Sequence, residues 1–396
     1  MFLACIVASA TVQPTSYNYR FAASSPLAKG RWVKIRVAEN GVYEISYDRL
    51  RQLGFANPEN VSVFGHGGKL FDSNFCSSTG EALYKDVPEQ VPVLHSNGKL
   101  LFYGHGPENI TMVSNRFERN DINIYANTGA YLLTDSTEPL LIATAECDRD
   151  NTLQRTALYD YVYHEIDKTQ GAGATGRNFW GEDLLAAPEY TWQLDLPFAL
   201  AGDKNFHRLQ VSVIVSKSGS GRLMFGLGRT YFGNMNLEVS NYKTHRVTAS
   251  SSDCTLDDQG REELVIRTRD LNLDFAGLDY WLFTYSKTFA DKDLSRFSQE
   301  RVCLALDNKS DGIAKSGWFQ VPEGAVVMDV TEGSQPALLP VEGTRAYFPE
   351  YSRQRFTVVF DPSKTQRQIE RYAVVVENQN LHADAAEGAD LLIVAS

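Results

Sequence analysis

The amino-acid sequence predicts a mainly β protein, in which an antiparallel β domain precedes a β-sandwich or jelly-roll-like region with few short helices. Aromatic residues make up 11% of the chain and include 19 Tyr and 21 Phe, a composition that favours strands. Short apolar segments, several of which alternate with polar residues, recur along the chain with turn residues between them. The length of 396 residues allows two or three domains, and we find no repeat of fixed period.

The first strands are predicted from alternation. The segment Val33–Val37 alternates apolar and basic side chains, and Tyr43–Tyr47 resumes the alternation. Asn40-Gly41 lies between the two segments, and both residue types tolerate the positive φ of a tight turn. We therefore expect a β-hairpin here.

A short helix and a second hairpin are expected next. Asp48 is a suitable N-cap, and Gly54 is placed to end the helix. Further on, Asn97-Gly98 separates the apolar runs at 91–94 and 100–103, which again predicts a hairpin.

We predict an N-terminal β domain over residues 27–150, closed by strands near 131–133 and 140–142. The polar stretch 148–155 is a plausible boundary, after which a β-sandwich region covers 151–382 and is either one unit or two units split near 310. Its early strands are expected at 211–215, 223–225, 237–239, 264–266, 280–285 and 302–306. A later group at 318–321, 326–330, 356–360 and 372–376 either completes the sandwich or forms a small third unit.

The two ends of the sequence indicate export and a further domain. Residues 1–10 resemble the remnant of a secretory signal peptide, with a short buried strand as the alternative, and residues 11–26 are expected to be a linker. The apolar run in Gly388–Val394 is typical of a strand buried on both faces in a parallel sheet. We therefore expect residues 383–396 to begin a further domain, so that the sequence is the front part of a longer exported protein.

The charge and the cysteines limit the classes of function. A formal net charge of −11 argues against non-specific nucleic-acid binding, and no apolar run is long enough for a membrane-spanning helix. Of the five cysteines, Cys5 would leave with a signal peptide. The other four are widely spaced and lack zinc-site spacing, so they predict one or two disulfides or buried free thiols: Cys76, Cys147, Cys254 and Cys303.

Two motifs are better explained as structure than as binding sites. Gly171–Gly176 matches the dinucleotide-binding pattern, but neither a buried strand nor a helix start flanks it, so we expect a Gly-rich loop. Asp270–Asp274 offers alternating oxygen ligands like a Ca²⁺ loop, but Phe275 stands where such a loop needs Gly. We expect a strand with one solvated polar face there.

Two histidines lie in Gly-rich turns, and His66 is ten residues from Cys76. A self-contained hydrolase using His66 and Cys76 is therefore one hypothesis, against the simpler reading that His66 and His105 are exposed or hydrogen-bonded turn residues. The aromatic pairs Phe179-Trp180 and Tyr190-Trp192 suggest a carbohydrate-binding or adhesive β-sandwich without catalytic activity, or simply core packing.

Several segments resemble, in their order and spacing, the PorU-type sortases of type IX secretion systems, whose peptidase domain is gingipain-like. Met328 stands where the family carries an aromatic residue. The similar segments are Gly30–Ile35, Gly41–Tyr47, Asn57–Gly68, Leu101–Pro107, Gly176–Glu182, Met328–Thr331 and Gly388–Val394.

The resemblance implies a cell-surface cysteine peptidase of a Gram-negative bacterium. Such enzymes remove C-terminal sorting domains from secreted cargo and attach the cargo to an anionic lipopolysaccharide, together with an outer-membrane shuttle protein. Their catalytic His and Cys lie in the peptidase domain, so no residue of this chain matches them. We accordingly predict a non-catalytic scaffold region without catalytic, cofactor-binding or metal-ligating residues.

Overall fold

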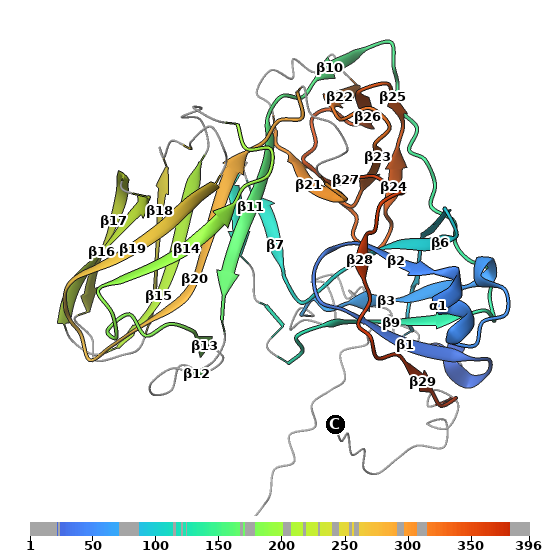
Figure 1. Cartoon of the computed structure of the whole chain (residues 1–396), viewed down its shortest axis with the longest axis horizontal. Coiled ribbons are helices and arrows are strands. Elements are labelled where there is room, and N and C mark those ends of the chain that lie inside the picture. The colour runs from blue at the N-terminus through green and yellow to red at the C-terminus, as the bar shows by residue number, and fades with distance from the viewer. Residues whose placement is uncertain are drawn as a thin grey trace, which may run out of the picture.

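The computed structural model describes residues 22–380, apart from 23, 71–86, 114–115, 120–121, 124, 167–168, 171–178, 201–206, 217–218, 229, 240–244, 253–255, 257–260, 291–296 and 307–314. Strands dominate this part of the chain and mostly pair antiparallel, which confirms the predicted fold class. Figure 1 shows three groups of strands, coloured mainly blue to cyan, mainly green to orange, and mainly red-brown. We call them the first, second and third sandwich.

The first sandwich consists of two facing sheets. One has the strand order β29 (Val374–Val376), β1 (Trp32–Val37), β9 (Gly129–Thr134), β3 (Ser62–Gly67) and β4 (Gln90–Val91). The other has the order β28 (Arg367–Gln368), β2 (Gly41–Ser46), β6 (Lys99–Gly104) and β5 (Val93–Ser96). Apolar side chains that alternate along the strands fill the space between the sheets, among them Ile35, Ile45, Phe102 and Leu133.

The two predicted hairpins have different outcomes. Asn97 and Gly98 have φ angles of 51° and 70° and join β5 to β6, so that hairpin is confirmed. The hairpin at Asn40-Gly41 is wrong, because β1 pairs with β9 and β29 whereas β2 pairs with β6 and β28. The dipeptide forms a corner between the two sheets.

The short helices differ slightly from expectation. The helix α1 (Tyr47–Gln52) is capped by Ser46, whose hydroxyl accepts a hydrogen bond from the backbone N–H of Arg49, and not by Asp48. Gly54 follows it with a φ of 94°. Two 3₁₀ turns, η1 (Pro26–Ala28) and η2 (Pro58–Asn60), lie before β1 and β3.

The last described strands return to the first sandwich. β28 lies parallel to β2, and β29 pairs antiparallel with β1, placing Val376 opposite Trp32 and Val375 opposite Val33. The expected strand at 372–376 therefore belongs neither to the second sandwich nor to a third unit, which corrects its predicted grouping. The predicted limits at 27, 150, 310 and 382 remain predictions, and residues 1–21 and 381–396 lie outside the described part.

An eight-stranded sheet forms one layer of both other sandwiches. Its order is β18 (His245–Ser252), β15 (Arg208–Ser216), β20 (Phe275–Ser286), β11 (Leu158–Glu165), β21 (Gln299–Leu304), β27 (Arg355–Phe360), β23 (Val326–Asp329) and β24 (Ala337–Leu339). The half from β18 to β11 packs on β14 (Glu189–Asp195), β19 (Arg261–Asn272), β16 (Gly219–Leu227) and β17 (Thr230–Val239). This second sandwich encloses Val211, Phe225, Ile266 and Phe283.

The other half of the same sheet builds the third sandwich. The strands β21, β27, β23 and β24 face a sheet of order β10 (Thr152–Gln154), β22 (Ser316–Gln320), β26 (Arg345–Pro349) and β25 (Val341–Glu342). Its core includes Val302, Phe319, Phe348 and Val359. The second and third sandwiches therefore share one continuous sheet.

Two small hairpins complete the described fold. The hairpin of β7 (Ile110–Val113) and β8 (Arg116–Arg119) lays Met112 and Phe117 against Tyr161 and Cys303 of the eight-stranded sheet. The pair β12 (Thr169–Gln170) and β13 (Phe179–Trp180) lies beside the second sandwich. Within the residues that the structure describes, no helix has the length and apolar character needed to cross a membrane.

Candidate functional site

The two histidines that were predicted in Gly-rich turns lie close to each other, His66 near the end of β3 and His105 directly after β6. The backbone N–H of Gly68 donates to the carbonyl of His105 at 2.9 Å, and the Nδ1 atom of His66 lies 3.9 Å from a carboxylate oxygen of Glu89. Cys76 falls outside the described residues, so the proposed His66–Cys76 pair stays untested.

His105 has a structural role. Its ring is buried, and Nε2 donates to the carbonyl of Gly333 at 2.9 Å, which links the first sandwich to the turn after β23. Burial, with a contribution from the nearby Lys69, lowers the pKa of His105 to about 4, so the ring is neutral at physiological pH.

Two cysteines can be placed. Cys147 and Cys303 are free thiols, and Cys303 is fully buried with its Sγ 3.4 Å from the Sδ of Met112. Burial raises the pKa of both thiols, which disfavours the nucleophilic thiolate. Cys5 and Cys254 lie outside the described residues. Among the residues that the structure describes, no three His, Cys, Asp or Glu side chains are arranged to hold a metal ion.

The oxygen-rich segment Asp270–Asp274 is a hairpin end and not a continuous strand. β19 ends at Asn272 and β20 begins at Phe275, and Asp270 has a left-handed φ of 49° where the pairing register shifts. The expected strand is therefore found for residues 270–272, whereas Leu273 and Asp274 form the turn between β19 and β20. The Gly171–Gly176 loop lies outside the described residues.

The aromatic residues considered for sugar stacking pack within the protein. The ring of Trp192 lies 5.8 Å from that of Trp281 and 5.4 Å from that of His164, both on the facing sheet. Trp180 packs edge-on against Phe275 at 4.7 Å. Contacts within the protein therefore account for Trp180 and Trp192.

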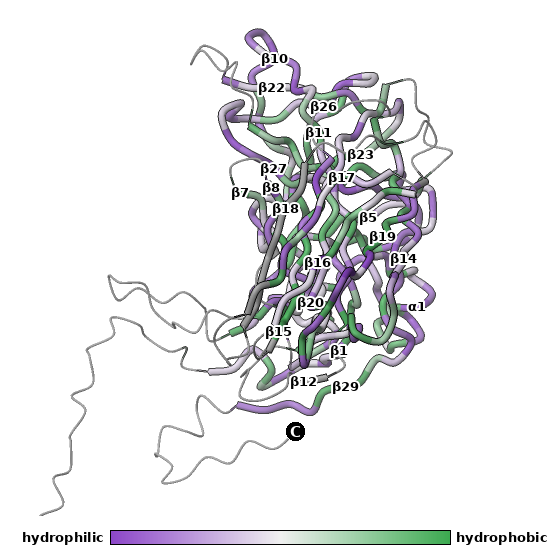
Figure 2. Tube along the Cα trace, turned by 90° about the vertical axis from the view of Figure 1, so that its left-hand side faces the viewer, coloured by the Kyte–Doolittle hydropathy of each residue, from purple (hydrophilic) through white to green (hydrophobic). Residues whose placement is uncertain are grey.

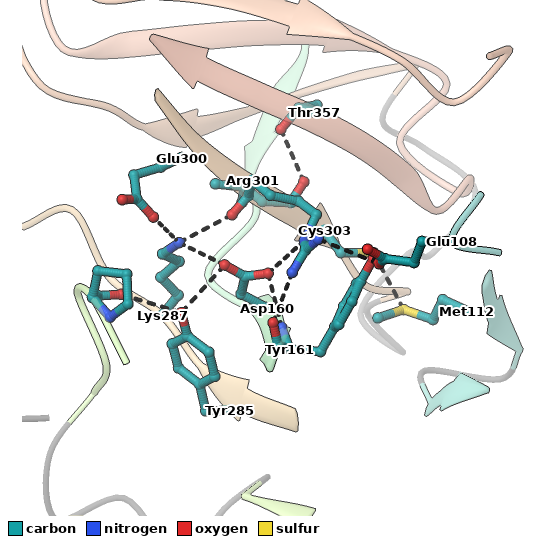
Figure 3. Close-up of polar contacts among 12 residues, drawn as sticks. Glu108, Met112, Asp160, Tyr161, Tyr285, Lys287, Glu300, Arg301, Cys303 and Thr357 are labelled. Carbon is teal, nitrogen blue, oxygen red and sulfur yellow. Dashed lines mark hydrogen bonds and ion pairs between the residues drawn. The ribbon is translucent and has the colours of Figure 1, made fainter. Parts of the chain in front are cut away.

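A cluster of buried and half-buried charges that sequence reasoning missed lies where the second and third sandwiches meet. It is shown in Figure 3, and we call it the charged joint. It comprises Glu108, Asp160, Lys287, Glu300 and Arg301.

Lys287 and Arg301 both bind Asp160. The ammonium of Lys287, with a side-chain exposure of 0%, lies 2.8 Å from Asp160 and 2.5 Å from Glu300. The Nε of Arg301 lies 2.7 Å from the other Asp160 oxygen, and its guanidinium stacks on the ring of Tyr161 at 3.4 Å. Tyr161 in turn donates its hydroxyl to Glu108.

The carboxylates differ in their acidity. Burial tends to raise the pKa of Asp160, but Arg301 and Lys287 together hold it below its usual value. Burial dominates at Glu300 and raises its pKa despite the contact with Lys287. Asp160 is thus the ionised centre of the cluster.

The backbone explains why charges gather here. β11 pairs with β20 over seven positions, Tyr159 to Glu165, but with β21 over only two, Leu158 and Tyr159. Beyond Tyr159 the strands β11 and β21 diverge, leaving carbonyl groups without ladder partners. Arg301 donates to the carbonyl of Tyr161 at 2.7 Å and Lys287 to that of Arg301 at 3.1 Å, so the charged side chains satisfy the opened sheet.

The joint also reaches the first sandwich. The side-chain amide of Gln299 bonds to both backbone groups of Val42, accepting at 2.9 Å and donating at 2.8 Å. Beside it, a cavity of about 180 Å³ is lined by residues of both regions, including Asp160, Arg301 and Arg367. Because this contact joins β2 to β21, the joint lies where all three sandwiches meet.

The fold was compared with those of known proteins. No protein-family model and no curated protein matches the sequence. A solved structure of dimeric latent PorU from Porphyromonas gingivalis is similar over 92% of this chain, with a TM-score of 0.73 and 22% sequence identity. The CBM36-1 domain of a multidomain xylanase from the hindgut metagenome of Trinervitermes trinervoides aligns with a TM-score of 0.20 and 12% identity over 32% of this chain and 95% of that domain, too low to support an argument.

The similarity to PorU extends over all but a small part of this chain, whereas it covers only 34% of the PorU chain. The three joined sandwiches described above are thus a recurring arrangement and not peculiar to this sequence. This chain has the fold of a region that makes up about a third of latent PorU.

Proposed function

We propose that this chain is the non-catalytic scaffold region of a PorU-like, cell-surface sortase. Two observations support the proposal: the sequence resemblance to PorU-type sortases, and a fold shared over 92% of the chain. In this proposal the parent enzyme is exported to the surface of a Gram-negative bacterium. It removes C-terminal sorting domains from type IX cargo and attaches the cargo to anionic lipopolysaccharide, with an outer-membrane shuttle protein as partner.

The observation that carries the scaffold role is the charged joint. It ties the three sandwiches together through buried and half-buried side chains, and both of its cations form ion pairs with carboxylates. Among the described cysteines, the thiol of Cys303 is buried and that of Cys147 has a raised pKa. A rigid frame of this kind suits the support of a neighbouring catalytic domain.

A peptidase assay on the purified chain tests the non-catalytic part of the proposal. We expect no cleavage of unstructured peptide substrates. Turnover that a thiol-alkylating reagent abolishes would contradict it, and a Cys76→Ser variant would then show whether the His66–Cys76 pair is responsible.

The identity of the parent enzyme is tested separately, by reading the encoding gene beyond the codon for Ser396. We expect a gingipain-like peptidase domain in frame. A stop codon there, together with tight binding on a glycan array, would favour the carbohydrate-binding alternative.

A further inference from the structure

The outer sheet of the second sandwich carries two arginines side by side, and neither forms an ion pair with an acidic residue that the structure describes. Arg222 on β16 and Arg269 on β19 are directly opposite in the antiparallel register, so their side chains leave the same face. Both are exposed. Like charges directly opposite each other destabilise a strand pair, so this arrangement costs stability unless something negative lies between them.

The remaining contacts leave both guanidinium groups available. The Nε–H of Arg222 donates to the side-chain oxygen of Asn236 at 3.0 Å, and this bond does not use the two terminal nitrogens of the guanidinium. Within the described part of the chain, the side chain of Arg269 has no hydrogen bond or ion pair. The neighbouring Arg267, by contrast, is paired with Glu189 and stacks on Tyr231 at 4.9 Å.

The two arginines line one shallow hollow of about 450 Å³, together with Ser220, Asn236 and Asp270. We call it the arginine hollow. A bulge shapes it: the register changes between the pairs Arg222–Arg269 and Ser220–Asn272, and Asp270 takes a left-handed φ of 49° there. Figure 2 views the molecule from this side, with β16, β19 and β14 toward the viewer and away from the charged joint.

We propose that the arginine hollow binds a tetrahedral oxyanion, the phosphate or sulfate group of a free ion or of an ester. Guanidinium groups match such anions with paired hydrogen bonds, and the hydroxyl of Ser220 and the amide nitrogen of Asn236 are further donors. The carboxylate of Asp270 borders the hollow and opposes the anion. The whole chain carries a formal charge of −11, whereas two arginines and one aspartate line this hollow.

Titration calorimetry of the full chain at low ionic strength tests the proposal, with inorganic phosphate, inorganic sulfate, glucose 6-phosphate and neutral glucose as probes. We expect saturable binding of the three anions and none of glucose. Tighter binding of glucose 6-phosphate than of phosphate would identify an ester group as the ligand, and equal binding would identify the free ion.

The variants make the test specific to this site. Arg222→Gln and Arg269→Gln should each weaken binding by roughly tenfold, as expected when a charge-assisted contact is lost. Asp270→Asn, which keeps a residue that tolerates the left-handed backbone, should strengthen binding. Arg36→Gln removes an exposed strand arginine from the first sandwich and should leave binding unchanged.

Three results would overturn the proposal: no saturable binding of any anion, equal weakening by Arg36→Gln, or weaker binding by Asp270→Asn. Thermal unfolding of each variant checks that it folds. Because the arginines are exposed and repel each other, neither Gln variant should lose stability.

Discussion

At the scale of single residues, the charged joint shows how a buried cation becomes tolerable in a β protein. Lys287 is enclosed by the end of β20 and by β21, and its ammonium meets Asp160, Glu300 and a backbone carbonyl. Burying a charge without partners is costly, but here each donor direction of the ammonium has an acceptor. Removing Lys287 would leave the buried carboxylate of Asp160 without one of its two cationic partners.

We therefore expect Lys287→Met to destabilise the protein by about 3–5 kcal/mol, because Asp160 and Glu300 would lose a cation in a buried site. Chemical denaturation monitored by tryptophan fluorescence measures the change. Lys34→Met, on an exposed position of β1, should change the free energy of unfolding by less than about 0.5 kcal/mol. A loss below about 1 kcal/mol for Lys287→Met would show that Lys287 is not needed in the joint.

His105 predicts a pH dependence. Its pKa is about 4 in the folded protein and about 6.5 when unfolded, so below pH 6.5 the unfolded state binds more protons. Stability should therefore fall as the pH drops from about 6.5 to about 4, by about 3 kcal/mol in total from this group. His105→Gln keeps a donor for Gly333 but does not titrate.

The free energy of unfolding is compared between the wild type and His105→Gln across this pH range. The carboxylates titrate in both proteins, so the difference reports on His105 alone. The wild type should lose about 3 kcal/mol more than His105→Gln between pH 6.5 and pH 4. Parallel loss in the two proteins would show that His105 does not sense the pH.

At the scale of elements, the same dipeptide gives two different structures. Asn97-Gly98 forms a hairpin turn, whereas Asn40-Gly41 forms a corner between sheets. Both dipeptides supply residues that tolerate unusual backbone angles, and that local property was readable from the sequence. Whether the flanking strands pair with each other depends on β9 and β6, which lie far along the chain and occupy the neighbouring positions.

Gly98 allows the cost of the turn to be measured. It has a φ of 70°, and a Cβ at this position would meet nothing within 4 Å, so the effect of a side chain is confined to the backbone. We expect Gly98→Ala to destabilise the protein by about 1 kcal/mol. Asn97→Gly, which leaves the turn geometry accessible, should be near neutral in the same thermal unfolding measurement. An unchanged midpoint for Gly98→Ala would contradict the assigned turn.

At the scale of the whole molecule, the sequence predicted the fold class, the approximate positions of the main strands and the resemblance to sortases. It did not predict the candidate site. Asp160, Lys287 and Arg301 are spread along the chain, and only the divergence of β11 from β21 brings them together. From its neighbours in the sequence alone, each of these three charged residues would be expected on the surface.

The return of β28 and β29 gives a prediction at this scale. A chain ending after Phe360 lacks both strands, and with them the hydrogen bond from the backbone of Gln366 to the buried carboxylate of Glu44. We expect the amides of β1 and β2 to exchange hydrogen markedly faster in this variant, while those of β15 and β20 keep their protection. Unchanged exchange in β1 and β2 would mean that the first sandwich is complete without its last strands.

This closing of the first sandwich by the last described strands bears on the order of events during biosynthesis. The early strands β1 and β2 emerge first, yet their outer neighbours are made more than three hundred residues later. Until then each sheet presents an open side to which foreign polypeptide can attach. We therefore expect that binding of a chaperone to the newly synthesised chain prevents such association until β28 and β29 have been made.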